Sequence, residues 1–288
     1  MLNLFLIIPV HNRKELTHSF LKSIFSQTNK NFETVIIDDG STDGTSLMIQ
    51  NSFPSVKVIN GDGNLWWTGA INLGVKYAIQ NGANYILCLN NDLICPNDYI
   101  QNILSNIQKY PDSIIGSLVV SHLDEDTIID GGSCINKYTA KNRSLYNGKK
   151  LSKIKFDDEV AKVNILSGRG VVIPAPVFPK IGLFNKKLPQ YGADYEFSIR
   201  AFSCGINLML AYNAKVYSFE KTHNIKKRYN ELGIMQFTKS LFSKKSSNCI
   251  LYRYRFSTLS FGKILGIWFF TLDVIRINLS YFLYKYQK

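Results

Sequence analysis

Two adjacent carboxylates, Asp38 and Asp39, follow an apolar run and precede a glycine turn in residues 35–45. A short apolar run bounded by Gly and Asp is typical of a buried parallel strand. Both acids are therefore expected at the carboxyl end of a strand, the edge of an open α/β sheet where ligands bind. Asp-Gly is also common turn chemistry, so a solvated turn remains an alternative for this stretch alone.

Polar residues also follow two similar apolar runs, at 4–10 and 85–89. A further polar residue lies at the start of a helix predicted from about residue 191. They are His11, Asn12 and Arg13, then Asn90, Asn91 and Asp92, and finally Asp194 in the first turn of the helix. The helix dipole favours an ionised carboxylate at that last position. Because the carboxyl ends of parallel strands meet at one edge of a sheet, we expect these side chains to converge on one crevice.

The elements that must position these residues alternate along the first 120 residues. Short apolar runs predict strands, and apolar residues at helical spacing predict helices. The predicted strands are 4–10, 32–38, 56–60, 85–89 and 114–120, and the predicted helices are 14–27, a short one ending near 51, 70–79 and 97–110, with a glycine-rich loop at 61–69. This alternation with short connections predicts an α/β fold with a doubly wound, mostly parallel sheet and flanking helices.

The regular pattern ends near residue 121. Residues 121–165 mix polar residues with short β-prone pieces, which predicts insertions that shape a second binding surface. A glycine turn at 166–170 then allows close approach of the backbone. We predict a catalytic domain at 1–215, with a donor half at about 1–120 and an acceptor half at about 121–215, and a basic, aromatic-rich helical extension at 216–288.

The net charge of +13 is concentrated in that extension, since residues 215–288 hold 14 Lys and Arg against 3 Asp and Glu. A basic segment suits nucleic acid or an anionic membrane surface. The many aromatic and aliphatic residues of the same segment favour a membrane interface over nucleic acid. Lys263, Asp273 and Arg276 interrupt the run before the roughly 20 apolar residues of a spanning helix. We therefore predict peripheral attachment, with a terminal helix packed on the core as the alternative.

The five cysteines are widely spread and form no C-x-x-C pair. This pattern fits a reducing compartment better than a disulfide framework or a zinc site. Residues 2–10 are apolar, but no Lys or Arg precedes them and no small-residue cleavage site follows, so a signal peptide is not expected. We predict a cytoplasmic protein that is peripheral at the inner face of the cell membrane.

A crevice that holds Asp39, Asp92 and Asp194 suits an anionic substrate only if a divalent cation lies between carboxylates and phosphates. Mg²⁺ or Mn²⁺ with a diphosphate fits this requirement. The sequence contains no G-x-x-x-x-G-K-[ST] loop and no G-x-G-x-x-G after the first strand. These absences disfavour a P-loop ATPase and a Rossmann dehydrogenase.

Four motifs carry a family resemblance. They are I-I-P-V-H-N-R at 7–13, V-I-I-D-D-G-S-T-D-G-T at 35–45, L-N-N-D at 89–92 and A-D-Y-E-F-S-I-R at 193–200. In this order they resemble the signature of family 2 inverting glycosyltransferases with the GT-A fold, over about residues 4–215. The stretch G-N-L-W-W-T-G-A-I-N-L-G at 63–74 further resembles the rhamnosyltransferase-like subgroup, which builds bacterial surface polysaccharides.

The resemblance implies a role for individual residues. Nucleotide-sugar binding would fall to Pro9, Val10, His11, Arg13, Asp38, Asp39, Trp67, Gly69, Asn72, Asn90 and Asn91. Asp92, at the last position of the D-x-D motif, and His223 would bind Mg²⁺ or Mn²⁺. Asp194 would act as the general base that takes the proton of the acceptor hydroxyl. The acceptor would contact Gly168, Arg169 and Glu196.

The chain departs from the family pattern at two positions. Asn90 replaces the first Asp of D-x-D and leaves one metal carboxylate, and Ala193 stands where many relatives have Glu. Apart from the family, His223 is more often a structural histidine, and Arg169 could be a solvated charge. Of Trp66 and Trp67, we expect at most one in the site, where it could stack on a sugar or base.

The resemblance implies an inverting glycosyltransferase that moves a sugar from a dTDP- or UDP-sugar to a lipid-linked glycan acceptor in O-antigen or capsule synthesis. A sugar nucleotidyltransferase is the alternative enzyme, but it would ordinarily carry a glycine-rich basic loop after the first strand, where this chain has residues 9–13. A non-catalytic, membrane-docked assembly subunit is the non-enzyme alternative.

Overall fold

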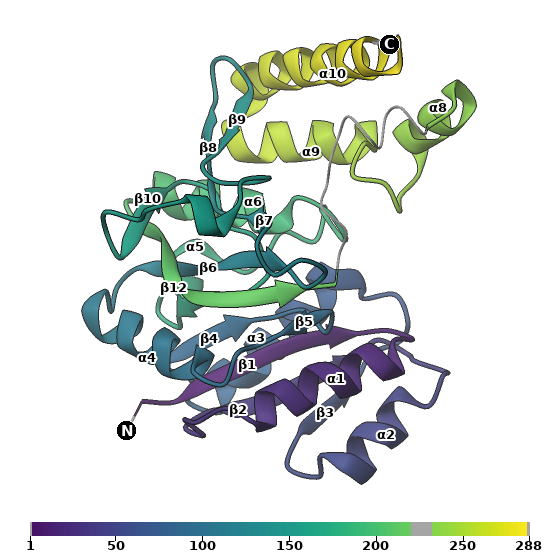
Figure 1. Ribbon diagram of the computed structural model, residues 1–288. Coiled ribbons are helices and arrows are strands. Elements are labelled where there is room, and N and C mark those ends of the chain that lie inside the picture. Colours follow the sequence, from purple (N-terminus) through teal and green to yellow (C-terminus); the bar gives the residue numbers. More distant parts are fainter. Residues whose placement is uncertain (1, 220–231, 287–288) are drawn as a thin grey trace.

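A ten-stranded mixed sheet forms the centre of the protein (Figure 1). The computed structural model describes residues 2–219 and 232–286. The main strand order is β10-β12-β6-β11-β4-β1-β2-β3, with β5 paired to β12 and β7 to β6. These strands are β1 (Leu4–Val10), β2 (Glu33–Asp38), β3 (Lys57–Asn60), β4 (Tyr85–Cys88), β5 (Leu93–Ile94), β6 (Ile114–Ser121), β7 (Ile128–Asp130), β10 (Val160–Val163), β11 (Val171–Pro174) and β12 (Leu208–Ser218).

Parallel pairing places the carboxyl ends of β1, β2 and β4 at the same edge of the sheet. Strand β1 pairs in parallel with β2 and β4, in a register that places Val10 opposite Asp38 and Ile7 opposite Cys88. Strand β12 pairs in parallel with β6, whereas β11 lies antiparallel between β4 and β6. The predicted fold class, a mostly parallel α/β sheet with flanking helices and C-terminal helices, is confirmed.

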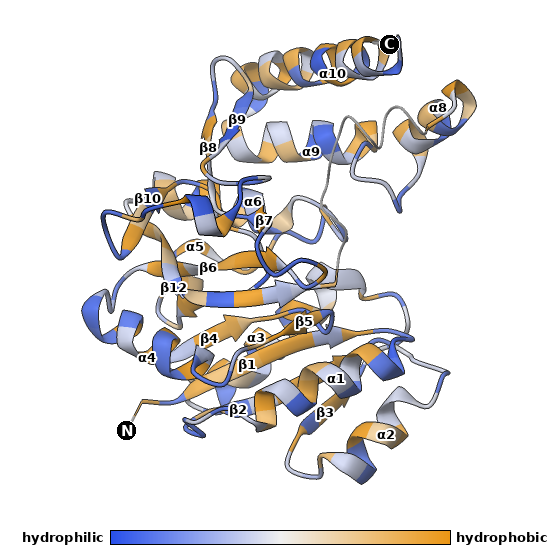
Figure 2. Ribbon diagram, viewed as in Figure 1, coloured by the Kyte–Doolittle hydropathy of each residue, from blue (hydrophilic) through white to orange (hydrophobic). Residues whose placement is uncertain are grey.

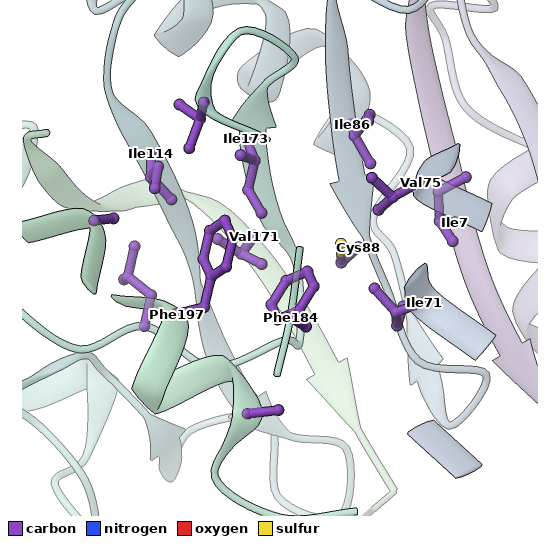
Figure 3. Packing of buried hydrophobic residues seen from close by; sticks show 14 of the residues in the cluster. Ile7, Ile71, Val75, Ile86, Cys88, Ile114, Val171, Ile173, Phe184 and Phe197 are labelled. Atoms are coloured by element: carbon purple, nitrogen blue, oxygen red, sulfur yellow. The ribbon is translucent and has the colours of Figure 1, made fainter. Parts of the chain in front are cut away.

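Helices cover both faces of the sheet because the central strands are apolar on both sides. Leu4, Leu6 and Ile8 pack with α1, α2 and α4, while Phe5 and Ile7 pack with α3, α5 and α6. Figure 3 shows part of the second layer, with Phe184 and Phe197 near Cys88 and Val171. These helices are α1 (Lys14–Phe25), α2 (Thr45–Ser52), α3 (Trp66–Gln80), α4 (Tyr99–Lys109), α5 (Val177–Ile181) and α6 (Ala193–Ser203).

One predicted element boundary was wrong. Helix α3 begins at Trp66 rather than at residue 70, where the Trp66 amide donates to the Asp39 carboxylate. Residue 215 lies inside β12, which pairs with β6 as far as Ser218, and the division into a domain at 1–215 and an extension at 216–288 stays a prediction. The predicted insertions at 121–165 form β7, the hairpin β8 (Ser133–Asn136) and β9 (Lys141–Ser144), the 3₁₀ helix η1 (Leu151–Lys153) and β10.

The C-terminal extension is helical, as expected, and packs on the rest of the chain (Figure 1). It contains α8 (Ile234–Phe242), α9 (Ile250–Phe261) and α10 (Lys263–Tyr286). Phe237 of α8 stacks on Tyr281 of α10 at 3.9 Å between ring centres. The β8–β9 hairpin reaches α10, where the Trp268 Nε1 donates to the carbonyl of Tyr138 at 2.8 Å.

Helix α10 has two faces. Figure 2 shows it as mostly hydrophobic with polar interruptions. By length and composition this 24-residue helix could cross a membrane, so its charges alone do not exclude a span, and peripheral attachment stays a prediction. Asp273 and Arg276 point toward the protein, since Asp273 pairs with Arg253 at 2.6 Å and Arg276 donates to the carbonyl of Thr139. The large apolar residues left exposed are Ile264, Ile267, Trp268, Ile275, Leu279, Phe282, Leu283 and Tyr286.

Candidate functional site

One large cavity of about 2160 Å³ lies between the carboxyl ends of the parallel strands and the C-terminal helices. It is lined at one end by Pro9, Val10, His11, Arg13, Asp39, Trp67, Asn90, Asn91 and Asp92, and further along by Gly168, Arg169 and Asp194. The predicted crevice therefore brings together twelve residues that the sequence motifs singled out. Its volume exceeds the roughly 300–1,000 Å³ of a pocket for one small ligand.

Asp39 organises the loop between β3 and α3. Its Oδ1 accepts hydrogen bonds from the amides of Gly63 (2.8 Å) and Leu65 (3.2 Å), and its Oδ2 accepts one from the amide of Trp66 (3.0 Å). Trp66 adopts a positive φ of 56°, which is uncommon for a bulky residue. The nearly buried carboxylate thus holds this backbone turn at the rim of the cavity. His11 is held beside it by a 2.7 Å bond between its Nδ1 and the Asp39 carbonyl oxygen.

Trp67 joins the first strand ends to the glycine turn that precedes β11. Its indole Nε1 donates to Oδ1 of Asn90 at 3.0 Å. A Cβ atom on Gly168 would lie 2.3 Å from Cζ2 of the same indole, so only glycine fits there without a shift. Both tryptophans line the cavity, and the expectation that at most one of them contacts a substrate stays a prediction. Asn90, which replaces an acid of the D-x-D motif, is positioned by Trp67.

Arg13 and Asp92 form an ion pair across the cavity wall, with Nη1 and Oδ2 3.2 Å apart. Within the described residues, the other oxygen of Asp92, Oδ1, is buried and has no hydrogen-bond partner. A buried carboxylate oxygen without a partner is costly and suits a cation that the site gains on binding. No group of three or more His, Cys, Asp or Glu that could hold a metal gathers in residues 2–219 and 232–286. Asp92 would therefore need ligand atoms from the substrate to complete such a site.

Asp194 lies in the first turn of α6, as predicted, after Gly192 in a left-handed conformation (φ 83°). The amides of Gly168 and Tyr195 donate to its two carboxylate oxygens at 3.0 and 2.9 Å. Burial raises the pKa of Asp194 above its ordinary value of 3.8, and the nearby charge of Asp130 raises it further, while these two amides and Arg169 oppose the shift. A carboxylate with a raised pKa is a stronger base than an ordinary aspartate.

Four candidate residues do not line the cavity. The Asp38 carboxylate is buried and accepts from the Ser41 amide at 2.9 Å and from the Ser46 hydroxyl. Asn72 exchanges hydrogen bonds with the backbone of Phe184 at 2.8 and 3.0 Å. Gly69 lies within α3, and Glu196 is buried and pairs with Arg200 through both oxygens at 2.9 Å. His223 lies outside the described residues.

Sequence reasoning missed several cavity residues. Asp130 follows Ile128-Ile129 and precedes two glycines, the same apolar-acid-glycine pattern that drew attention to Asp38 and Asp39. Tyr195 and Gln190 also line the cavity. The C-terminal helices contribute Lys239, Lys245, Arg253 and Arg276. No local pattern identifies these four, because their position depends on how α8, α9 and α10 pack.

The mixed, mostly parallel sheet with its flanking helices has a GT-A-like fold. Solved structures of GalNAc-T7 with UDP, GalNAc and Mn²⁺ and of Staphylococcus aureus TarS residues 1–349 superpose on this chain with TM-scores of 0.62 and 0.60, at 16% and 14% identity. They cover 96% and 100% of this chain, and the chain spans 55% and 93% of theirs. A Pyrobaculum calidifontis mannosyltransferase with GDP-Man and Mn²⁺ covers 96% of this chain, which spans 73% of it, at a TM-score of 0.54 and 13% identity.

The chain belongs to glycosyl transferase family 2, whose model matches residues 5–164. An uncharacterised glycosyltransferase of Rickettsia typhi is 25% identical over 279 residues, which are 92% of this chain and 79% of the relative. A second one, of Rickettsia prowazekii, is 26% identical over 68% of this chain, which spans 58% of that relative. Glycosyltransferase GlyG of Streptococcus pneumoniae is 23% identical over 85% of this chain and 80% of its own length.

Proposed function

We propose that this glycosyltransferase is an inverting enzyme of the rhamnosyltransferase-like subgroup. It transfers a hexosyl or deoxyhexosyl group from a dTDP- or UDP-sugar to a lipid-linked glycan in O-antigen or capsule synthesis. The observation that carries the proposal is Asp194, a carboxylate of raised pKa in the wall of the cavity, fixed by two backbone amides. The GalNAc-T7 structure with UDP and the mannosyltransferase structure with GDP-Man support a nucleotide-sugar donor.

The chemistry requires one proton transfer and one displacement. The Asp194 carboxylate removes the proton of the acceptor hydroxyl while that oxygen bonds to the anomeric carbon of the donor. The bond from this carbon to the diphosphate oxygen breaks on the opposite face, so the configuration inverts and the nucleoside diphosphate leaves. The amides that hold Asp194 keep the carboxylate in one orientation, which lowers the entropic part of the barrier.

Asp92 and the diphosphate oxygens would hold Mg²⁺ or Mn²⁺, with His223 as a further candidate ligand. The partnerless Oδ1 of Asp92 and the Mn²⁺ in two structural neighbours support this assignment. When bound, the cation stabilises the negative charge of the departing diphosphate. Arg13, whose Nη1 pairs with Asp92, would also bind the diphosphate.

Attachment to the inner face of the cell membrane is part of the proposal. The outward face of α10 is apolar, and the extension is basic, which together suit an anionic bilayer surface. We expect the double substitution of Leu279 and Leu283 by Glu to release the protein from vesicles that contain anionic lipid. The matched control is Leu47→Glu, at an apolar residue of α2 that is 62% exposed. Unchanged sedimentation of the double variant with vesicles would refute membrane attachment.

Catalysis is tested with Asp194→Asn. We expect turnover of nucleotide sugars, screened with and without Mn²⁺, to fall by about 10²–10⁴-fold, the usual contribution of a general base. Binding of UDP, measured by calorimetry, should persist, because Asp194 is not assigned to the donor. Turnover equal to that of the parent protein would remove Asp194 from the role of base. Wild-type protein without any transfer or hydrolysis across the donor screen would refute the enzyme assignment.

A further inference from the structure

The two ends of the cavity differ in charge. Among the described lining residues before 219, four carboxylates, Asp39, Asp92, Asp130 and Asp194, face two cations, Arg13 and Arg169. The described lining residues of the C-terminal extension instead comprise four cations, Lys239, Lys245, Arg253 and Arg276, and one carboxylate, Asp273. A nucleotide diphosphate at the strand ends therefore does not account for the cationic end of the cavity.

The cationic end has the donors of an anion site. Arg253 uses Nη1 to pair with Asp273, while its Nε is buried and has no hydrogen-bond partner among the described residues. No described ion pair neutralises Lys239 or Lys245, which extend from α8 and the loop before α9. Ser240, Ser243, Ser246, Ser247 and Ser280 also line this end, although the Ser240 hydroxyl already donates to the Phe237 carbonyl at 2.6 Å. The ammonium groups of Lys239 and Lys245 and the guanidinium group of Arg253 are suited to phosphate oxygens.

The same helix that closes this end carries the exposed apolar face. Helix α10 presents Asp273, Arg276 and Ser280 to the cavity and Ile275, Leu279 and Leu283 to the outside. A ligand that reaches the cationic end from the outer side of α10 therefore meets apolar surface before it meets the cations. This order, apolar chain and then anion, is that of a phosphorylated lipid.

We propose that the α8–α10 segment binds the phosphate of a lipid-phosphate-linked acceptor, with Lys239, Lys245 and Arg253 as the anion-binding residues. The inference rests on the proposed function, because it names the chemical class of the acceptor for the same cavity. It places the acceptor's phosphate at the cationic end and leaves the carboxylate-rich end to the donor. Asp194 lies between them, since α6 touches Gly168 through Asp194 and touches α9 through Gly192 and Phe256.

Binding of farnesyl diphosphate to the full-length protein, saturated with UDP and Mn²⁺, tests the proposal without requiring turnover. We expect the double variant Lys239→Ala/Lys245→Ala to bind it at least about tenfold more weakly, because each partly exposed charge contact contributes a few-fold. UDP affinity should stay unchanged. The matched control is Lys244→Ala, which removes an adjacent exposed lysine that does not line the cavity and should leave farnesyl diphosphate affinity unchanged.

Further probes identify the recognised group. Farnesol, which lacks the phosphates, should bind weakly and equally to wild type and the double variant, and inorganic pyrophosphate should bind more weakly than farnesyl diphosphate. Equal affinity of wild type and double variant for farnesyl diphosphate would overturn the proposal, as would competition with UDP or equal affinity for pyrophosphate. Since these are binding measurements, the inference can fail while Asp194-dependent turnover persists. Conversely, the proposed function can fail while the α8–α10 segment still binds farnesyl diphosphate.

Discussion

Substitution of Asp39 by Asn separates two roles that a carboxylate at this strand end could have. The resemblance assigns Asp39 to the nucleotide, whereas the structure shows its two oxygens accepting three backbone amides from residues 63–66. If Asp39 chiefly holds this turn, the substitution must cost stability in the absence of any nucleotide. If Asp39 served only the nucleotide, the protein without ligand would be as stable as the wild type.

The size of the effect follows from the hydrogen bonds. An asparagine side chain retains one acceptor oxygen and presents an NH₂ group, so at least one of the three amides faces a donor instead of an acceptor. A hydrogen bond to a charged group contributes about 1.5–3 kcal/mol, and a buried amide left without a partner adds about 1–3 kcal/mol. Relaxation of the turn recovers part of this, so we expect a loss of about 2–4 kcal/mol in the free energy of unfolding.

Urea unfolding of the protein without nucleotide measures this loss directly. Asp62→Asn is the matched control, because it removes a charge from the same loop at an exposed residue that accepts one hydrogen bond, from the Asn64 amide at 2.9 Å. We expect this control to change stability by less than about 0.5 kcal/mol. An Asp39→Asn variant as stable as the control would refute the turn-holding role and return Asp39 to direct nucleotide contact.

Other substitutions and conditions test neighbouring parts of the site. Gly168→Ala should lower kcat/KM by about 10²-fold, because its Cβ would displace the Trp67 indole that positions Asn90; steady-state kinetics that match wild type would contradict this. Glu196→Gln should lower the free energy of unfolding by about 3 kcal/mol, measured in urea, because it breaks the buried pair with Arg200. If Glu196 does not contact the acceptor, the acceptor KM of the folded variant should equal that of the wild type. Since the pKa of Asp194 is raised above 3.8, kcat/KM should fall with decreasing pH at a pH above that of an ordinary aspartate, as a pH–rate profile would show. Between 3.8 and the raised pKa the folded protein binds more protons than the unfolded chain, so stability falls as pH rises through this window, and Asp194→Asn should lose that dependence in thermal unfolding measured against pH.

Strand ends were predictable because a few local features determine them. An apolar run of β-prone residues that stops at a polar residue indicates both the strand and its end, and short connections through helices make neighbouring strands parallel. Val10, Asp38 and Asn90 therefore fall at one edge of the sheet. Asp194 was predictable for a similar reason, since a glycine followed by an acid at the start of an amphipathic helix indicates the first turn.

Hydrogen-bond partners were not predictable from the same patterns. Glu196 and Asp194 are two residues apart and both acidic, yet one faces the cavity and the other turns toward Arg200 within the fold. In the sequence Asn72 resembles a polar site residue, but its side chain exchanges hydrogen bonds with the backbone of Phe184, 112 positions away. Such pairings depend on long-range packing, and a motif match does not distinguish a ligand contact from a buried structural one.

The charge distribution along the cavity argues for two ligands that meet at Asp194. A volume of about 2160 Å³ is more than one nucleotide sugar needs, and a single anionic ligand at the carboxylate-rich end would not account for Lys239 and Lys245 at the other end, which no described ion pair neutralises. Transfer requires the anomeric carbon of one molecule and the hydroxyl of another to reach the same base. In the proposed function Asp194 is that base, because it contacts the glycine turn that packs on Trp67 while its helix packs on α9. Residues of the C-terminal extension line the same cavity as Asp194, so under the proposed function its deletion should abolish acceptor binding as well as membrane attachment.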